Sequence, residues 1–234
     1  MTSFFITISY MALTVAGYLF FRHIYSKWPH PLLHVVPLTT ALIIIVLVAT
    51  KAPYADYEPA KDILTFFMGP ATVALALPLY RYRNILRDRA LPLLGCVALG
   101  SFLSMALAGL VAALGGMPEA FTASVMPKGT STPFAVEIAA FHSGIPALAS
   151  AFVVATGVFG AFSGLCLLTL CKIYEPTARG LAMGVCFHAI GTVASLEEGE
   201  LQGAMAGLAM ILSGLFSALF APFILPLLRL LGSS

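Results

Sequence analysis

The chain has 234 residues, of which 60% are hydrophobic and only 9% are charged, and its mean hydropathy is +0.98. A soluble domain of this length needs more charge on its surface, so the composition excludes that class and predicts an all-α polytopic membrane protein. At roughly 20 residues per crossing, the chain has room for about seven spanning helices. The net charge of +2 comes without a basic patch interleaved with aromatic residues, which argues against a nucleic-acid partner.

The apolar segments follow one another with short polar connections, and we expect a single transmembrane domain, residues 1–234, with approximate halves 1–115 and 116–234. A polar connection rich in Pro, Tyr, Asp and Glu is predicted at 51–62. The uninterrupted spans are predicted at residues 4–21, 32–50, 91–114, 145–171 and 202–231.

Two further segments are apolar but interrupted. The first, residues 65–80, contains Gly69-Pro70 near its middle, where a continuous helix would lose a hydrogen bond and meet a ring clash. The second, residues 180–196, contains Gly191 and repeats in Thr192-Val193-Ala194 the tripeptide that starts at Thr72. Paired interrupted segments are typical of transporter binding sites, so we predict an inverted repeat built on two broken helices.

Residues 119–142 are too polar and too interrupted for an ordinary span, since they contain the stretch PKGTSTP at 127–133. We expect a re-entrant pair of half-helices that meet at this stretch, because irregular backbone at membrane depth must be buried in protein or line a cavity.

The distribution of basic residues predicts the orientation in the membrane. Nine of the twelve fall on one side if the loops that follow residues 21, 80 and 171 share that side with the carboxyl terminus. They are Arg22, Lys27, Arg81, Arg83, Arg87, Arg89, Lys172, Arg179 and Arg229. By the positive-inside rule this side, with the carboxyl terminus, is cytoplasmic, and the acids at 197–200 lie on the other side.

Lys128 and Glu137 are the formal charges at predicted membrane depth, where a charge costs roughly 2.5–3.5 kcal/mol on insertion scales. Lys128, beside the hydroxyls at 130–132, could neutralise an anionic substrate while backbone NH groups hydrogen-bond it. The alternatives are a structural Lys128–Glu137 pair, or a lysine that snorkels to the interface. Glu137 has a structural or interfacial role, or else couples transport to protons.

His188 lies midway through the second interrupted segment, where it could bind substrate, carry a proton, or simply be hydrogen-bonded within the protein. Thr72 and Thr192 follow the two breaks, and either capping of a half-helix or substrate contact accounts for them. The candidate substrate-binding residues are Gly69, Pro70, Thr72, Lys128, Thr130, Ser131, Thr132, His188, Gly191 and Thr192, with His188 and Glu137 as candidates for proton coupling.

The sequence contains no GxSxG, HExxH or nucleotide-binding loop, so we expect no enzyme and no cofactor, with an intramembrane hydrolase as a remote alternative. The four cysteines lie in or beside apolar segments without a CxxC pair. We expect them to be small buried apolar residues rather than metal ligands or disulfides.

Three stretches together resemble the LrgB/CidB family of bacterial membrane proteins, and the similarity runs from about residue 10 to residue 230. They are GPATVALALPLY at 69–80, PKGTSTPFA at 127–135, and GLAMGVCFHAIGTVAS at 180–195 followed by GAMAGLAM at 203–210. The family more often has a bulkier residue where Gly129 stands.

The resemblance implies one of two functions in the bacterial cytoplasmic membrane. Some family members are described as regulators of murein hydrolase export and lysis, acting with a small holin-like partner. Others are described as carriers of glycolate, glycerate or pyruvate. The interrupted segments and the polar re-entrant stretch favour a carrier of small organic acids, acting as a homo-oligomer such as a dimer, because a holin-like pore needs no such internal architecture.

Overall fold

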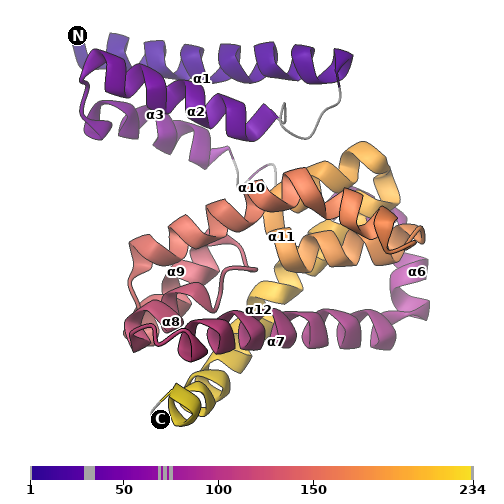
Figure 1. Ribbon diagram of the computed structural model, residues 1–234. Helices are drawn as coiled ribbons and strands as arrows, with labels where there is room; N and C mark the ends of the chain where they lie inside the picture. Colours follow the sequence, from indigo (N-terminus) through magenta and orange to yellow (C-terminus); the bar gives the residue numbers. More distant parts are fainter. Residues whose placement is uncertain (1, 29–34, 68–69, 71–72, 74–75, 233–234) are drawn as a thin grey trace. The chain divides into compact units, whose positions relative to one another are not determined.

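The computed structural model describes residues 2–28, 35–67, 70, 73 and 76–232, and all regular secondary structure in these residues is helical (Figure 1). The chain forms two compact units, residues 1–76 and 77–234. The predicted all-α class is confirmed in the described residues.

Unit 1 includes the helices α1 (Thr2–Lys27), α2 (Val35–Thr50) and α3 (Tyr54–Phe66). Helices α2 and α3 both pack on α1, where Tyr57 makes an edge-on contact with Tyr10. The prediction of a polar connection at 51–62 is wrong for most of its length, because α3 begins directly after Pro53. Its charges lie on the surface, where Lys61 pairs with Glu58 and Asp62.

Unit 2 is framed by two long helices that cross each other and run in the same sense, α7 (Ala90–Leu114) and α12 (Glu200–Gly232) (Figure 1). The short helices α5 (Ala76–Arg81) and α6 (Arg83–Asp88) precede α7. Leu93 and Val97 pack with Ala204 and Ala209 near the two helix starts. Further along, Met105 packs with the segment 221–225. Both helices therefore run away from the end of unit 2 that carries Arg81, Arg83, Arg87 and Arg89, which we call the basic end.

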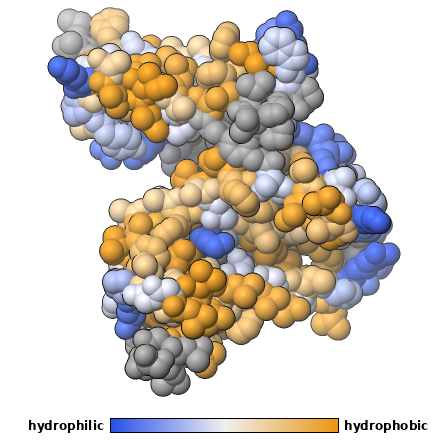
Figure 2. Space-filling model, viewed as in Figure 1, coloured by the Kyte–Doolittle hydropathy of each residue, from blue (hydrophilic) through white to orange (hydrophobic). Residues whose placement is uncertain are grey.

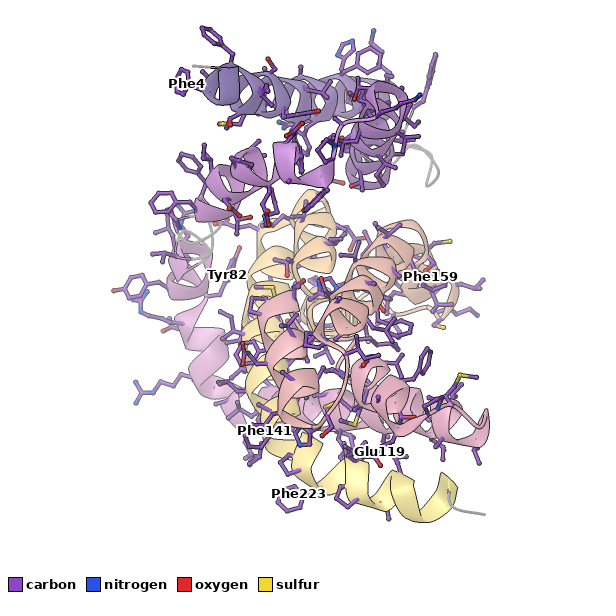
Figure 3. All side chains as sticks on the ribbon, turned by 90° about the vertical axis from the view of Figure 1, so that its left-hand side faces the viewer. Phe4, Tyr82, Glu119, Phe141, Phe159 and Phe223 are labelled. Carbon is purple, nitrogen blue, oxygen red and sulfur yellow. The ribbon has the colours of Figure 1, made fainter. Side chains whose placement is uncertain are left out.

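A helical hairpin enters unit 2 from the end opposite the basic end. It consists of α8 (Glu119–Val125), a loop at 126–131 and α9 (Thr132–Phe141). Met126 and Thr130 in the loop are buried to 1% or less exposure, while Glu119 and Phe141 lie together at the outer end (Figure 3). The hairpin has the geometry expected of a re-entrant segment that meets at PKGTSTP.

Helix α11 (Pro176–Glu198) doubles back on itself at His188, whose φ of 43° and ψ of −129° interrupt the helix. The Arg179 guanidinium binds the Glu198 carboxylate, with Nε 2.8 Å from Oε2. In a straight helix these two residues, 19 positions apart, would be separated by about 28 Å. The two arms, 176–187 and 189–198, therefore form a second hairpin.

Helix α10 (Pro146–Leu170) connects the two hairpins. Ala149 and Val153, near its start, pack on α9, whereas Gly164 lies against Met183 and Thr169 against Arg179. Helix α10 thus begins at the end of unit 2 that lies opposite the basic end, and it finishes at the basic end. The second hairpin starts where α10 finishes. The two hairpins enter unit 2 from opposite ends, and their tips lie inside it (Figure 1).

The fold-back of α11 corrects the predicted orientation. Glu198 pairs with Arg179, and Glu200 pairs with Arg81 at 2.6 Å, so these acids lie at the basic end and not on the other side. Residues 180–196 do not cross unit 2 as a broken span, because both arms return to the end where they started. Helix α12 then leads away from the basic end, so the carboxyl terminus does not share that end with Arg81 and Arg179.

Among the described residues, four helices could cross a membrane by length and composition: Phe4–Lys27, Ala90–Leu114, Pro176–Glu198 and Glu200–Leu228. The third is the doubled-back α11, and a bent pair, Pro146–Ala161 and Ser163–Leu170, could be one further span. Large apolar side chains cover much of the surface in Figure 2.

The cysteines carry no disulfide, but Cys96, Cys166 and Cys171 are exposed, so the expectation that they are buried is wrong for these three.

The contact between α11 and α12 depends on Gly184. A Cβ atom there would overlap the backbone of Ala206, which cannot move aside without displacing α12. We expect Gly184→Ala to lower the free energy of unfolding by about 1–3 kcal/mol, as for overpacked cores. Thermal unfolding of the purified protein in detergent measures this change. Gly95→Ala, where an added Cβ would touch nothing within 4 Å, is the matched control and should be neutral or slightly stabilising.

Candidate functional site

The tips of the two hairpins meet inside unit 2. A Cβ atom added at Gly129 would lie 2.7 Å from Ser104 Oγ of α7 and 3.2 Å from the Val185 carbonyl oxygen of α11. The loop therefore passes between α7 and the end of the first α11 arm. Glycine allows this close approach because it has no Cβ atom. The bulkier residue that the LrgB/CidB family more often has at this position would crowd Ser104 and Val185.

Lys128 lies in this loop and is partly buried. Its ammonium makes no salt bridge with any carboxylate of the described residues, so the predicted Lys128–Glu137 pair is not present. It is close enough to Cys186, two residues before the α11 break, to interact with its thiol electrostatically. Figure 2 shows a small hydrophilic area amid apolar surface between α10 and α7. The tip thus carries a positive charge without a negative partner in the described chain.

Two half-helices begin at this level, one in each hairpin. Helix α9 starts after Ser131, which makes no side-chain cap, and the second α11 arm starts after His188. The first NH groups of a helix have no partner within it and form the positive end of its dipole. Together with Lys128, the two helix starts form a region suited to an anion.

Some of the predicted substrate-binding residues already make hydrogen bonds or packing contacts within the protein. The Thr130 hydroxyl donates to the Pro127 carbonyl at 3.0 Å, and the Thr192 hydroxyl donates to the His188 carbonyl at 2.9 Å. Gly191 is buried where an added Cβ would overlap the Met183 carbonyl, so it permits the two α11 arms to approach. The hydroxyls of Ser131 and Thr132 are half-buried and make no hydrogen bond with the described residues.

His188 is 4% exposed, and its Nε2–H donates to the Val153 carbonyl at 3.0 Å. This bond joins the hairpin tip to α10 and accounts for the histidine at the break. Its Nδ1 makes no hydrogen bond with the described residues. The helix is interrupted at His188, three residues before the glycine at which the sequence predicts the break.

The remaining predicted residues lie away from the tips or outside the described chain. Gly69 and Thr72 are outside the described residues, Pro70 is exposed, and the predicted Gly69-Pro70 break falls there. Glu137 is exposed on α9, beside a groove of about 490 Å³ between α9 and α12. Phe141 of α9 and Pro222 of α12 also line it, at the end of unit 2 where Figure 3 labels Phe141 and Phe223.

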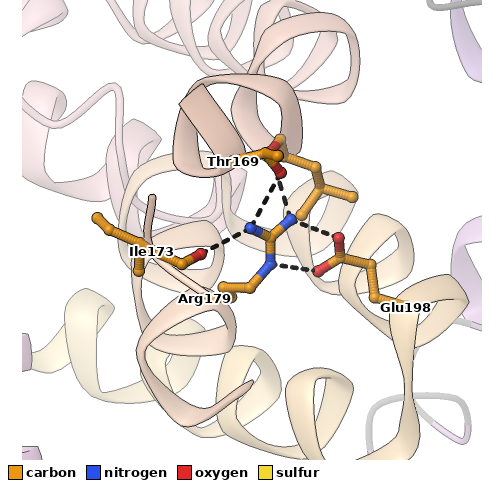
Figure 4. A network of polar contacts seen from close by, with 5 residues as sticks. Thr169, Ile173, Arg179 and Glu198 are labelled. Atoms are coloured by element: carbon orange, nitrogen blue, oxygen red, sulfur yellow. Dashed lines mark hydrogen bonds and ion pairs between the residues drawn. The ribbon is translucent and has the colours of Figure 1, made fainter. Parts of the chain in front are cut away.

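Arg179 holds the base of the α11 hairpin (Figure 4). All five of its NH donors are used: two on the Glu198 carboxylate and three on the Thr169 hydroxyl and the carbonyls of Ile173 and Leu165. Its side chain is 8% exposed. Because no donor remains, this arginine fixes the hairpin and does not bind a ligand.

Glu175 caps the start of α11 by accepting a hydrogen bond from the Ala178 backbone NH at 2.5 Å. Burial raises the pKa of this carboxyl, but the hydrogen bonds from Ala178 and Thr177 and the charge of Arg89 outweigh burial and lower it overall. A lowered pKa stabilises the folded state above the unfolded pKa, and the stabilisation is lost as the pH falls through the folded value.

We therefore expect Glu175→Ala to cost about 1 kcal/mol of unfolding free energy near neutral pH, the usual contribution of such a cap. The difference from wild type should shrink as the pH falls below the unfolded pKa and through the lowered folded pKa, because protonation then removes the carboxylate that accepts the hydrogen bonds. Thermal unfolding measured between pH 3 and 7 checks this, and Glu175→Asp should retain most of the cap. A difference that stays constant over the pH range would show that the carboxylate charge is not involved.

Ser104, which lies at the tip, is not singled out by the sequence pattern. Arg179, at the base of the α11 hairpin, serves in the sequence only as one of the basic residues that predict the orientation. Neither sequence position signals that the chain folds back. The described residues contain no group of three or more His, Cys, Asp or Glu side chains that could hold a metal ion. The tips present the Lys128 ammonium, hydroxyl groups and backbone NH groups, which act through charge and hydrogen bonds.

A family model described as the LrgB-like family matches residues 14–227. The chain is 34% identical over 219 residues to the uncharacterized protein YxaC of Bacillus subtilis, covering 94% of this chain and 95% of YxaC. It is 33% identical over 220 residues to an uncharacterized protein of Haemophilus influenzae, covering 94% and 95%. It is 30% identical over 192 residues to the antiholin-like protein LrgB of Bacillus mycoides, covering 81% and 84%. No solved structure matches the chain.

Proposed function

The chain belongs to the LrgB-like family, and from that premise and the hairpin tips we propose that it is a secondary transporter of small organic acids, such as glycolate, glycerate or pyruvate. The observation that carries the proposal is Lys128, a charge at the buried tip that no carboxylate of the described chain neutralises. A lone charge at membrane depth is costly, and a substrate carboxylate would offset that cost.

The arrangement of the hairpins supports alternating access. Residues 90–142 contain a long helix followed by a hairpin, and residues 146–198 contain the same two parts in the opposite direction. We propose that these segments form the inverted repeat, in place of the pairing of 65–80 with 180–196. Broken backbone around a shared site is the arrangement by which such repeats bind a substrate near the bilayer midplane.

We propose the bacterial cytoplasmic membrane as the location, with the basic end of unit 2 on the cytoplasmic side. Helix α12 then takes the carboxyl terminus to the other side, contrary to the sequence-based expectation. A homo-oligomer such as a dimer remains our proposal for the assembly. Proton coupling, if transport uses it, would involve the free Nδ1 of His188 or the exposed carboxylate of Glu137.

A second candidate function comes from the printed name of the Bacillus mycoides relative, an antiholin-like protein. In that case the chain would regulate murein hydrolase activity with a small holin-like membrane partner and would carry no substrate itself. Lys128 favours the transporter, because a purely regulatory protein does not need a partly buried charge without a carboxylate partner in the described chain between two helix starts.

Uptake of labelled glycolate and pyruvate into proteoliposomes that contain only the purified protein separates the two functions. The transporter should give saturable uptake that unlabelled monocarboxylates compete away. A regulator should give none, and a phenotype would appear only when the holin-like partner is present. Absence of saturable uptake from a folded, correctly inserted protein contradicts the proposal.

A further inference from the structure

Three serines with free hydroxyls lie at the level of the hairpin tips, outside the set predicted from the sequence. Ser104 comes from α7, and Ser213 and Ser217 from α12. Ser213 and Ser217 are each 1% exposed. None of the three hydroxyls makes a hydrogen bond with the described residues. By contrast, Ser101 of α7, Ser163 and Thr169 of α10 and Thr192 of α11 each donate to the carbonyl four residues back.

The packing of α7 along α12 places the three serines at one height. Val97 packs with Ala209 on one side of them, and Met105 packs with Ala221 on the other. Ser104 and the pair 213 and 217 fall between these two contacts. Ser104 is also the residue that Gly129 of the loop approaches, so this height is that of the Lys128 tip.

The two α12 serines face the interior between α7 and α9. At 3.6 residues per turn, Ser213 and Ser217 lie on one face of the helix. On one flank of that face, Phe220 contacts Phe102 of α7. On the other, Gly214 lies against the Phe134 ring of α9. Their hydroxyls therefore point toward the space that the α9 start and the loop occupy.

Ser213 and Ser217 are buried and Ser104 is half-buried, and a polar group that is withdrawn from water without a partner is costly. Three such hydroxyls beside an anion site favour a polar ligand. We propose that Ser104, Ser213 and Ser217 are specificity-determining residues, which bind the hydroxyl group of a substrate whose carboxylate lies at Lys128. This inference rests on the proposed function. It implies that hydroxylated monocarboxylates bind more tightly than acids of the same size that lack the hydroxyl.

The test compares how well unlabelled glycolate and acetate, which differ by one hydroxyl, inhibit uptake of labelled glycolate into proteoliposomes. Wild type should prefer glycolate by about tenfold, which corresponds to one net hydrogen bond. Ser104→Ala and Ser217→Ala should bring the ratio of the two inhibition constants toward one. Ser101→Ala is the matched control, because Ser101 is equally buried on α7 but already donates to the Val97 carbonyl at 2.7 Å.

The ratio separates a binding role from a packing role, since a packing defect would weaken both inhibitors alike. A ratio that stays at the wild-type value in both variants, or that falls equally in Ser101→Ala, overturns the assignment while the transport function stands. Wild type that takes up neither acid contradicts the proposed function itself, and the assignment with it.

Discussion

Replacing Lys128 by glutamine is expected to reduce glycolate uptake by about 10- to 100-fold, because the contact with the substrate carboxylate is no longer charge-assisted. The side chain keeps a similar length and can still donate, but the tip loses its positive charge. Because no carboxylate of the described chain pairs with Lys128, the substitution leaves no buried anion behind, and the protein should remain folded.

Proteoliposome uptake measures the effect, and the melting temperature of the same preparation verifies folding. Lys61→Gln is the control, because Lys61 lies on the surface of unit 1 beside Glu58 and Asp62 and should leave uptake unchanged. Lys128→Arg should retain part of the activity, since it keeps the charge. Unchanged flux in a folded Lys128→Gln protein would remove the proposed anion site.

The second large effect is expected at the base of the α11 hairpin. Glu198→Ala leaves the Arg179 guanidinium buried without its carboxylate and should lower the free energy of unfolding by about 3 kcal/mol or more. The exposed pair of Arg81 and Glu200 at the same end is the matched control, and Arg81→Ala should cost less than about 1 kcal/mol.

A double-mutant cycle with Arg179→Met and Glu198→Met distinguishes pairing from packing. If the two side chains stabilise the hairpin through their pair, the double variant should be more stable than the sum of the single effects predicts. Thermal unfolding in detergent is the measurement. Strictly additive single effects would mean that the pair contributes little beyond the separate contacts of each residue.

The first hairpin could be predicted from the sequence because its signals are local. Two prolines and three hydroxyl residues at 127–133 cannot continue a helix, and Lys128 cannot face lipid, so a buried turn is the remaining solution. The all-α membrane class could also be predicted, from the high hydrophobic and low charged content of the sequence. The structure adds Gly129, whose contacts with α7 and α11 are not visible in its neighbours along the chain.

The second hairpin could not be predicted, since residues 176–198 have the length and hydropathy of an ordinary crossing. Its determinants are distant in sequence: Arg179 with Glu198, Gly191 with Met183, and His188 with Val153. The expectation of a break near Gly191 was close in position, but a break does not tell whether the following arm continues or returns. The serines of α12 were missed for a similar reason, because helix-spaced serines in an apolar segment resemble ordinary packing residues.

The return of α11 to its starting side also matters for how reporter fusions are interpreted. A hairpin enters and leaves on the same side, so the segments before and after it lie in the same compartment. A hydropathy plot instead assigns residues 176–198 one crossing of the membrane. Reporter fusions placed in the 171–175 turn and at Gly199 should therefore report the same compartment. Only fusions placed after α12 should report the other compartment.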